Sequence, residues 1–166
     1  MWWRLPRAQW LRQKHDGNKR AILKLVKGGE TPGLLAYVGG QPIGWCAIAP
    51  RADYPRLAAS RTLMPVDDQP VWSVTCFFVA RPYRRRGVTV ELLKAAVEFA
   101  RARGARIVEG YPVEPKKEQP DAFVYTGLAS AFREAGFKEV LRRSPTRPIM
   151  RYMIGNESRK AAAARA

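Results

Sequence analysis

The feature of this sequence that most constrains its fold is an apolar run followed at once by an arginine-rich turn, a glycine and an amphipathic helix. Residues 72–79 are almost entirely apolar, which predicts a central strand buried on both faces. Residues 81–86 hold four arginines and lead into Gly87. Residues 87–103 then place apolar side chains at helical spacing, namely Leu92, Leu93, Ala96, Val97, Phe99 and Ala100. A buried strand, a basic turn and a helix in this order predict an α/β fold.

The rest of the chain supplies further strands and helices around this segment. Residues 106–110 predict a short strand that lies parallel to residues 72–79 through a right-handed crossover. Residues 50–70 and 112–120 predict loops, because prolines recur in them. We also expect helices over 18–28 and 126–135, a hairpin of strands at 34–38 and 42–48, and two final strands at 137–141 and 148–154.

Length and composition fit one domain. The chain has 166 residues, of which 46% are hydrophobic, as in an ordinary globular protein. We expect a single domain over residues 1–154 and a flexible tail over 155–166. No apolar run approaches the roughly 18–20 residues that a membrane-spanning helix needs. The first residues also lack the apolar core of a signal peptide. We therefore expect a cytoplasmic protein with no membrane partner.

Cysteine and histidine usage gives no indication of a metal site. Cys46 and Cys76 lie in apolar runs and are expected to be buried thiols in a reducing compartment. His15 is the only histidine and is expected in a solvated loop. Because a zinc site needs several such ligands together, we expect no bound metal.

Basic residues greatly outnumber acidic ones. Thirty lysines and arginines against 14 acidic residues give a net charge of +16. This excess implies an anionic partner or anionic surroundings, and a nucleotide cofactor would use only part of it. Because the positive charges are spread along the chain, we prefer a solvated basic surface to a dedicated nucleic-acid groove.

The turn before the strongest helix has the chemistry of a phosphate site. The peptide N–H groups of such a turn and of the first helical turn have no partners inside the helix and meet the positive end of the helix dipole. Gly87 allows the backbone to approach phosphate oxygens closely. Arg84, Arg85 and Arg86 add positive charge. The pattern predicts an anion site that is made mostly of backbone.

The residues around this turn resemble the acetyl-CoA motif of the GNAT acetyltransferase superfamily. Residues 78–93 read FVARPYRRRGVTVELL, in which Arg84 matches the family's Arg or Gln position and Gly87 its first glycine. Residues 37–45 look like the hairpin that precedes this motif, and residues 132–137 look like the late helix that ends in a Gly-Phe turn. The resemblance covers roughly residues 33–153, in the order of the family.

This resemblance implies a mixed α/β fold with a mostly antiparallel sheet, splayed at its centre, and helices on both faces. It implies acetyl-CoA as the coenzyme A thioester that donates the acyl group. In the family, a primary amine attacks the thioester directly in a ternary complex. The backbone at Phe78 and Val79 would pair with the pantetheine arm, and an N–H there would stabilise the carbonyl oxygen. The residues implied for the pyrophosphate are Arg84, Arg85, Arg86, Gly87, Val88 and Thr89.

The sequence departs from the family pattern in three places. Thr89 stands where the family prefers Gly or Ala. Phe132 stands where many members carry the tyrosine that protonates the departing thiolate. The family opens with a strand and a helix before the helix expected here at 18–28, but only 17 residues precede it. The start is therefore shortened, or residues 2–5 supply a strand differently.

Several residues are candidates for proton transfer. Glu109 is the first candidate base, because it sits near the C-terminal end of a parallel strand, where sites of open sheets lie; a surface ion pair with an arginine is the competing interpretation. Direct loss of the amine proton to water is also open. Tyr125 is the candidate acid, against a partly buried tyrosine with a bound hydroxyl, and Ser130 is a weaker one. Asp67 and Asp68 could attract an amine, although an exposed turn is preferred.

The aromatic residues fall into two groups. The strand residues Trp45, Trp72, Phe77 and Phe78 are expected in the core. The N-terminal tryptophans Trp2, Trp3 and Trp10 could cover an acceptor pocket, stack on a base or pack onto the sheet, and we prefer the last interpretation.

The function that these observations favour is an acyl-CoA-dependent N-acetyltransferase. The acceptor would be an amine on a small molecule or a protein, and a homodimer stays open. The alternative is a basic module of the same fold that docks on nucleic acid or the ribosome with little turnover. The intact Arg84 and Gly87 turn favours the enzyme, and the +16 charge argues against a strongly cationic acceptor.

Overall fold

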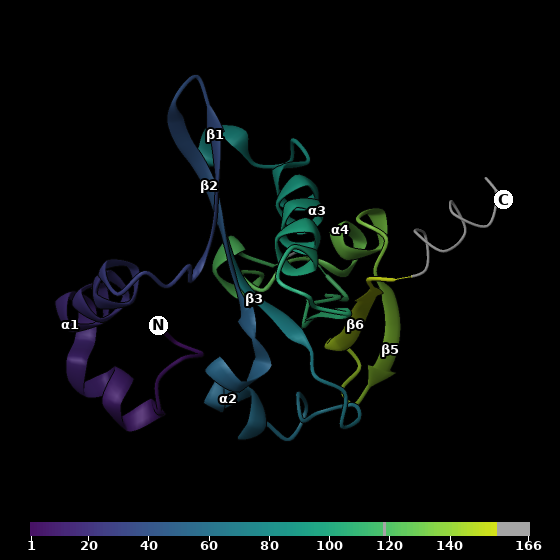
Figure 1. The fold of residues 1–166 in the computed structure, drawn as a ribbon. Helices are drawn as coiled ribbons and strands as arrows, with labels where there is room; N and C mark the ends of the chain where they lie inside the picture. Colours follow the sequence, from purple (N-terminus) through teal and green to yellow (C-terminus); the bar gives the residue numbers. More distant parts are fainter. Residues whose placement is uncertain (118, 156–166) are drawn as a thin grey trace, which may run out of the picture.

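The computed structural model describes residues 1–117 and 119–155 (Figure 1). Its helices are interspersed among the strands along the chain, and short 3-10 turns lie at Arg51–Asp53, Arg81–Tyr83 and Asp121–Phe123. Among the described residues, no helix is both long and apolar enough to cross a membrane. The elements in chain order are α1 (Arg7–Lys27), β1 (Gly33–Val38), β2 (Gln41–Pro50), α2 (Pro55–Ala58), β3 (Trp72–Val79), α3 (Val88–Arg101), β4 (Ile107–Gly110), α4 (Ala129–Glu134), β5 (Lys138–Arg142) and β6 (Pro148–Met153).

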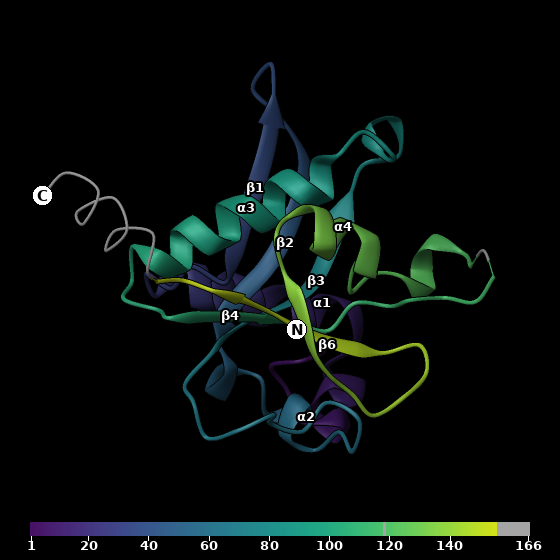
Figure 2. The same ribbon diagram turned by 90° about the vertical axis from the view of Figure 1, so that its right-hand side faces the viewer.

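The strands form one mixed sheet in the order β1-β2-β3-β4-β6-β5. Only β3 and β4 are parallel; the other neighbours are antiparallel, which confirms the predicted mixed, mostly antiparallel sheet. Helices α3 and α4 lie on one side of the sheet, and α1 lies on the other side of β1–β3 (Figures 1 and 2). The β3–β4 pairing runs only from Trp72↔Val108 to Val74↔Gly110. Beyond this point the two strands separate, so the sheet is splayed at its centre.

An irregularity in β3 changes which side chains face which side of the sheet. Ala47 pairs with Cys76 and the next residue, Ile48, pairs with Val74, so Thr75 is an extra residue on β3. Val74 and Phe77, three positions apart, consequently enter the same apolar core.

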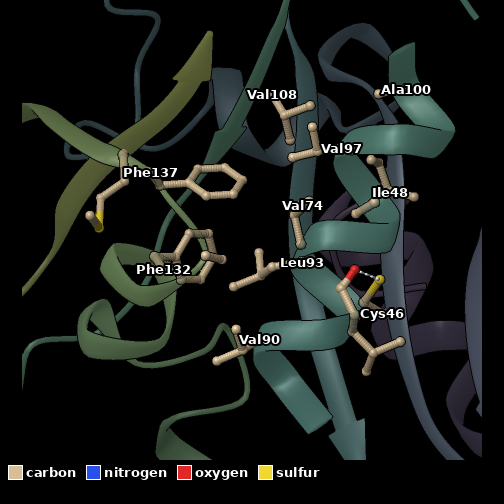
Figure 3. Close-up of a cluster of buried hydrophobic side chains, with 14 of the residues drawn as sticks. Cys46, Ile48, Val74, Val90, Leu93, Val97, Ala100, Val108, Phe132 and Phe137 are labelled. Atoms are coloured by element: carbon tan, nitrogen blue, oxygen red, sulfur yellow. Dashed lines mark hydrogen bonds between the residues drawn. The ribbon is translucent and has the colours of Figure 1, made fainter. Parts of the chain in front are cut away.

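The apolar core between the sheet and α3 explains why residues 88–101 fold as a helix here. Its helical stripe of Leu92, Leu93, Ala96, Val97 and Ala100 is buried against the strands and α4 (Figure 3). The Cys46 thiol lies in this core and contacts the Leu92 carbonyl, with sulfur and oxygen 3.8 Å apart. Burial raises the pKa of Cys46 to about 12, so the thiol stays protonated at neutral pH.

Some predictions in the central strand were wrong. The expectation that residues 72–79 are buried on both faces fails at Phe78, which is 59% exposed, because its side chain lies beyond the bulge on the face that α3 does not cover. Cys76 is also only half-buried. The core assignment holds for Phe77.

The N-terminal part also differs from expectation. Helix α1 begins at Arg7, not residue 18, and is kinked at Lys14, whose φ is 47°. Trp2 to Leu5 form a turn and not a strand. His15 is exposed, as expected, but lies in the helix.

Boundaries in the later segments changed as well. The region 50–70 contains α2, and α4 begins at Ala129 because Leu128 forms a parallel bridge with Val113. The tail expected from residue 155 lies, from residue 156 on, outside the described residues.

Candidate active site

The arginine-rich turn joins the end of β3 to the start of α3. Two of its residues have left-handed backbone conformations, Arg85 with a φ of 58° and Gly87 with a φ of 77°. Gly87 is the N-cap of α3. The Arg84 Nε donates a hydrogen bond to the Val79 carbonyl oxygen, 2.9 Å away. This bond holds the turn against the end of the central strand.

The backbone of this turn leaves hydrogen-bond donors open. No hydrogen bond among the described residues uses the N–H groups of residues 86–89, whereas the N–H groups of Val90 and Glu91 donate to the Gly87 carbonyl at 2.9 and 3.1 Å. A Cβ added to Gly87 would meet no atom within 4 Å, so the space in front of this glycine is open. Open N–H groups at the positive end of a helix bind phosphate oxygens. The residues present therefore fit a pyrophosphate, and Thr89, half-buried at the start of α3, leaves the turn open.

The chain segment around Tyr125 bridges the two strands where they splay. On one side, the Phe77 N–H donates to the Tyr125 carbonyl at 2.7 Å; on the other, the Val113 N–H donates to the Gly127 carbonyl at 2.8 Å. Because peptide directions alternate along a strand, Val79 faces the same gap as Phe77, and Phe78 faces β2. The two peptides that open toward the gap are thus those of Phe77 and Val79.

Tyr125 is the predicted acid, and its side chain lies beside this gap. Burial raises the pKa of Tyr125, and the positive charges of Arg147 and Arg56 only partly oppose the shift. The phenol therefore keeps its proton at neutral pH, as an acid must. Phe132, which has the position of the family's tyrosine, is fully buried, with its ring 5.1 Å from the Phe137 ring centroid. It is a core residue.

Glu109, the predicted base, is completely buried in a network of charged and hydroxyl groups. Its Oε1 accepts hydrogen bonds from Arg51 at 3.1 Å and from the Tyr111 hydroxyl at 2.7 Å, and its Oε2 accepts one from Arg151 at 2.7 Å. Ser73 also contacts the Tyr111 hydroxyl, at 2.8 Å. Burial, and next the Glu109 charge, strongly raise the pKa of Tyr111. The carboxylate is paired with arginines, but in the interior and not on the surface.

The remaining candidates lie away from the gap. Arg151 donates two hydrogen bonds to Asp67, at 2.6 and 3.0 Å, and these bonds lower the pKa of Asp67. Asp68 is exposed in the same loop, and Ser130 is exposed on α4. The structure therefore brings Tyr125, Phe77, Val79 and the turn to the splay. Glu109 pairs with Ser73 just before the last β3–β4 pair, but its side chain is enclosed by arginines, and Asp67 and Asp68 lie in the loop before β3.

A cavity of about 370 Å³ opens on the face of the sheet opposite α3, beside Tyr125. We call it the aromatic cavity. The N-terminal tryptophans form part of its wall, and the Trp2 and Trp10 rings contact each other edge to face at 4.8 Å. Its lining consists of Met1, Trp2, Trp3, Arg4, Trp10, Ile22, Pro32, Trp45, Ala47, Tyr54, Thr75, Cys76 and Tyr125.

Sequence reasoning missed several residues of this cavity. Tyr54 lies in a region predicted as a loop, and Thr75 and Cys76 lie in a strand predicted to be buried throughout. No local pattern marks these residues, because many segments far apart in the sequence meet to form the wall. The recurrence of tryptophan in the first ten residues was the only available signal.

The splayed mixed sheet and the open turn before α3 define an α/β protein with the architecture of an acetyltransferase. Residues 1–119 match the model of the Acetyltransferase (GNAT) family, and the chain belongs to this family. No match was found among curated proteins.

Solved structures of the same fold are distant in sequence. A GNAT-family protein from Desulfovibrio desulfuricans has a TM-score of 0.55 and 16% identity, over 84% of this chain and 80% of that one. The GNAT-family acetyltransferase from Streptococcus pneumoniae has a TM-score of 0.53 and 17% identity, over 82% and 76%. The ribosomal-protein-alanine N-acetyltransferase from Brucella melitensis has a TM-score of 0.52 and 17% identity, over 83% and 77%. These similarities show the fold.

Proposed function

We propose that the protein is an acyl-CoA-dependent N-acyltransferase that transfers an acetyl group from acetyl-CoA to a primary amine. The observation that carries this proposal is the set of open N–H groups at residues 86–89, directly after a strand that splays from its parallel neighbour. The turn fits a pyrophosphate, and Tyr125, whose carbonyl accepts the Phe77 N–H in the splay, also lines the aromatic cavity. Donor and acceptor sites would thus meet at the splay.

The residues proposed to hold the donor lie along one path. The backbone of residues 86–89 would bind the pyrophosphate, with Arg84, Arg85 and Arg86 supplying positive charge. The Val79 peptide would pair with the pantetheine arm, and Phe78 would offer its exposed ring, since its peptide faces β2. The thioester supplies an activated acyl group; the chain supplies position and charge.

The Phe77 N–H is the peptide donor nearest the cavity. It points into the gap, where an oxyanion would need a hydrogen bond. Because this N–H is bonded to the Tyr125 carbonyl, its use in catalysis requires the segment around Tyr125 to shift. The protonated Tyr125 hydroxyl is then available to donate a proton to a departing thiolate.

Glu109 is poorly suited to take the amine proton. Both of its oxygens already accept hydrogen bonds from arginines, and the side chain is completely buried, so neither oxygen is open to an incoming amine. We propose that the amine loses its proton to water, and that Glu109 holds β4, β6 and the Arg51 segment together.

The test is calorimetric titration with acetyl-CoA and with CoA at two salt concentrations. We expect saturable one-site binding that survives the higher salt. Gly87→Gln should weaken binding at least about tenfold by filling the space that the phosphates need. Gly104→Gln is a matched control, because Gly104 has the same φ of 77° and the same open space but lies at the other end of α3.

Two outcomes would count against this function. Equal CoA binding by both glycine variants would show that the pyrophosphate does not bind at the turn. Binding that disappears at higher salt and is reproduced by any polyanion would favour the basic nucleic-acid-docking module instead.

A further inference from the structure

The wall of the aromatic cavity combines indole and phenol rings with almost no charge. Six of its lining residues are aromatic, and none is a carboxylate. Arg4 is the only arginine or lysine among them; its guanidinium pairs with Asp53 at 3.5 Å and lies 4.9 Å from the Tyr54 ring centroid. A volume of about 370 Å³ is at the lower end of the range for small-molecule sites. The cavity therefore fits one aromatic ring system with short substituents.

Two further arginines neighbour residues of this wall, although neither is itself part of the lining. The Arg56 guanidinium lies 3.4 Å from the centroid of the Trp2 ring, and its Nη1 is buried without a hydrogen-bond partner among the described residues. The Arg147 Nη1 donates to the Thr126 hydroxyl at 3.2 Å. Neither arginine has a carboxylate within ion-pair distance in the described part of the chain. Desolvation lowers the pKa of both, and both charges act on Tyr125.

Polar atoms in the wall also lack partners. The Tyr54 hydroxyl and the Thr75 hydroxyl belong to side chains that are each 1% exposed, and neither makes a hydrogen bond of normal geometry, although Thr75 is near enough to Tyr54 to influence its pKa. The Trp3 Nε1 is likewise buried without a hydrogen-bond partner among the described residues. Buried polar groups are normally satisfied, so these atoms add polar capacity to an otherwise aromatic wall, with Thr75 and Arg4 both close to Tyr54.

We propose that the aromatic cavity binds the acyl acceptor, and that this acceptor is an amine that carries both an aromatic ring and a carboxylate. The proposal rests on the proposed function for its chemistry. The ring stacks on the tryptophans, the carboxylate is attracted by the charges of Arg56 and Arg147 next to the wall, and the amine faces the splay at Tyr125. Two kinds of compound share this chemistry: aromatic α-amino acids and aminobenzoates.

The same charges exclude the cationic acceptors that an aromatic cage would otherwise suit. Cages of tryptophan and tyrosine bind quaternary and protonated amines when their surroundings are neutral or acidic. Here the charges in or next to the wall are the Met1 ammonium and the guanidinium groups of Arg4, Arg56 and Arg147. The nearby carboxylate of Asp53 pairs with Arg4 and is not part of the lining. A polyamine or a protonated lysine side chain would be repelled and would lose its hydration without gaining a counter-ion.

The surroundings also prepare the amine for attack. Desolvation and neighbouring positive charge both disfavour an ammonium, so the bound amine gives its proton to water before it reacts. Its lone pair then forms the N–C bond to the thioester carbonyl, the C–S bond breaks, and the electron pair leaves on sulfur. The amide nitrogen loses a second proton to water, and the thiolate takes one from Tyr125 or from water. No carboxylate base is needed, which agrees with the engaged state of Glu109.

The first experiment measures binding without relying on turnover. Phenylalanine, 4-aminobenzoate, 2-phenylethylamine and spermidine are titrated into the purified protein by calorimetry, with and without CoA. We expect phenylalanine or 4-aminobenzoate to bind at one site; which of the two binds distinguishes an α-amine from a ring amine. Phenylethylamine, which lacks the carboxylate, should bind at least about tenfold more weakly, since a charge-assisted hydrogen bond is lost. Spermidine should not bind.

Charge-removing variants locate the carboxylate. Arg56→Gln and Arg147→Gln are compared with Arg143→Gln, an exposed arginine that donates only to the Met64 and Pro65 carbonyls, at 2.7 and 2.9 Å. One or both of the first two should weaken the ring–carboxylate probe about tenfold without weakening phenylethylamine, whose ammonium these guanidinium groups repel. The ratio of the two dissociation constants within one variant is insensitive to a general loss of stability. The control should preserve the ratio of the wild-type protein.

The outcomes separate this inference from the proposed function. CoA binding with no binding of either ring–carboxylate amine, or with equal or tighter binding of phenylethylamine or spermidine, overturns the acceptor class and leaves the transferase intact. A ratio unchanged in both arginine variants also overturns it. Binding of a ring–carboxylate amine to a protein that binds no CoA keeps the cavity assignment and removes the transferase.

Discussion

The two faces of the sheet are held by different kinds of interaction. On the α3 face, the buried residues are almost all apolar, and Leu93, Val97 and Phe132 fill the space between helices and strands (Figure 3). On the opposite face, Glu109, Arg151 and Arg51 form a hydrogen-bonded network beside a smaller apolar cluster that includes Tyr54 and Leu57. The same strands thus carry a dry core on one side and a charged interior on the other.

Both faces contribute to stability, but they differ in how they respond to pH, salt and ligands. Apolar packing is tolerant of pH and salt, and the α3 face positions the turn that would hold the donor. The opposite face combines charge, unsatisfied hydroxyls and a cavity, which are features that respond to ligands. The following variants test how far the two faces are independent.

The largest effect is expected from Glu109→Gln. The amide keeps the shape of the side chain but removes the carboxylate partner of Arg51 and leaves Arg151 with Asp67 alone, so unfolding free energy should fall by about 3–5 kcal/mol. Urea titration measures this change. Glu98→Gln, which breaks an exposed pair with Arg101, is the control and should cost less than about 1 kcal/mol. Equal losses in the two variants would show that the network does not hold the face.

A slightly smaller loss is expected from Leu93→Ala on the α3 face. Leu93 is fully buried, and its truncation leaves a cavity worth about 2–5 kcal/mol of unfolding free energy. Thermal and urea unfolding give the value. If the faces are independent, the double variant with Glu109→Gln shows additive losses; an interaction energy above about 0.5 kcal/mol would indicate coupling through the sheet.

A smaller effect is expected from Tyr111→Phe. This change removes the hydroxyl that joins Arg51, Glu109 and Ser73 and keeps the ring in the apolar cluster. We expect a loss of about 1–2 kcal/mol in urea unfolding. Tyr152→Phe, on the half-buried ring beside Phe137, is the matched control and should be close to neutral.

The smallest effect is the acid response of Asp67→Asn. The pKa of Asp67 is lowered by hydrogen bonds from Arg151, so its contribution is present above the unfolded pKa of about 4 and is lost as the pH falls through the lower folded pKa. The difference in melting temperature between wild type and variant should therefore be largest near pH 7 and shrink toward zero below pH 4. A difference that grows on acidification would contradict the assignment.

Contiguous features were predictable from the sequence, and assembled ones were not. The segment from Trp72 to Arg101 encodes strand, turn and helix in neighbouring residues, so the fold and the candidate donor site could be predicted together. The partners of Glu109 come from Arg51 and Arg151, 58 and 42 residues away, and no local pattern joins them. A buried carboxylate in a strand looks the same in the sequence whether it acts as a catalytic base or holds segments together through ion pairs.

The exposed Phe78 shows a second limit. Hydrophobicity predicts burial only when another element covers the side chain, and the sequence does not show where that cover ends. The N-terminal tryptophans show a related limit. Trp2 and Trp3 line a cavity only because strands and loops distant in the sequence lie opposite them, and the sequence does not show this.

The extra residue at Thr75 affects how this strand should be aligned with related sequences. Counting alternate positions from Trp72 assigns Val74 correctly to the α3 face but places Phe77 on the wrong one. A relative without the bulge would need a one-residue gap between Val74 and Cys76. Ungapped alignments across β3 would then compare core positions with cavity positions. Substitutions that affect core packing could not be separated from those that affect ligand specificity.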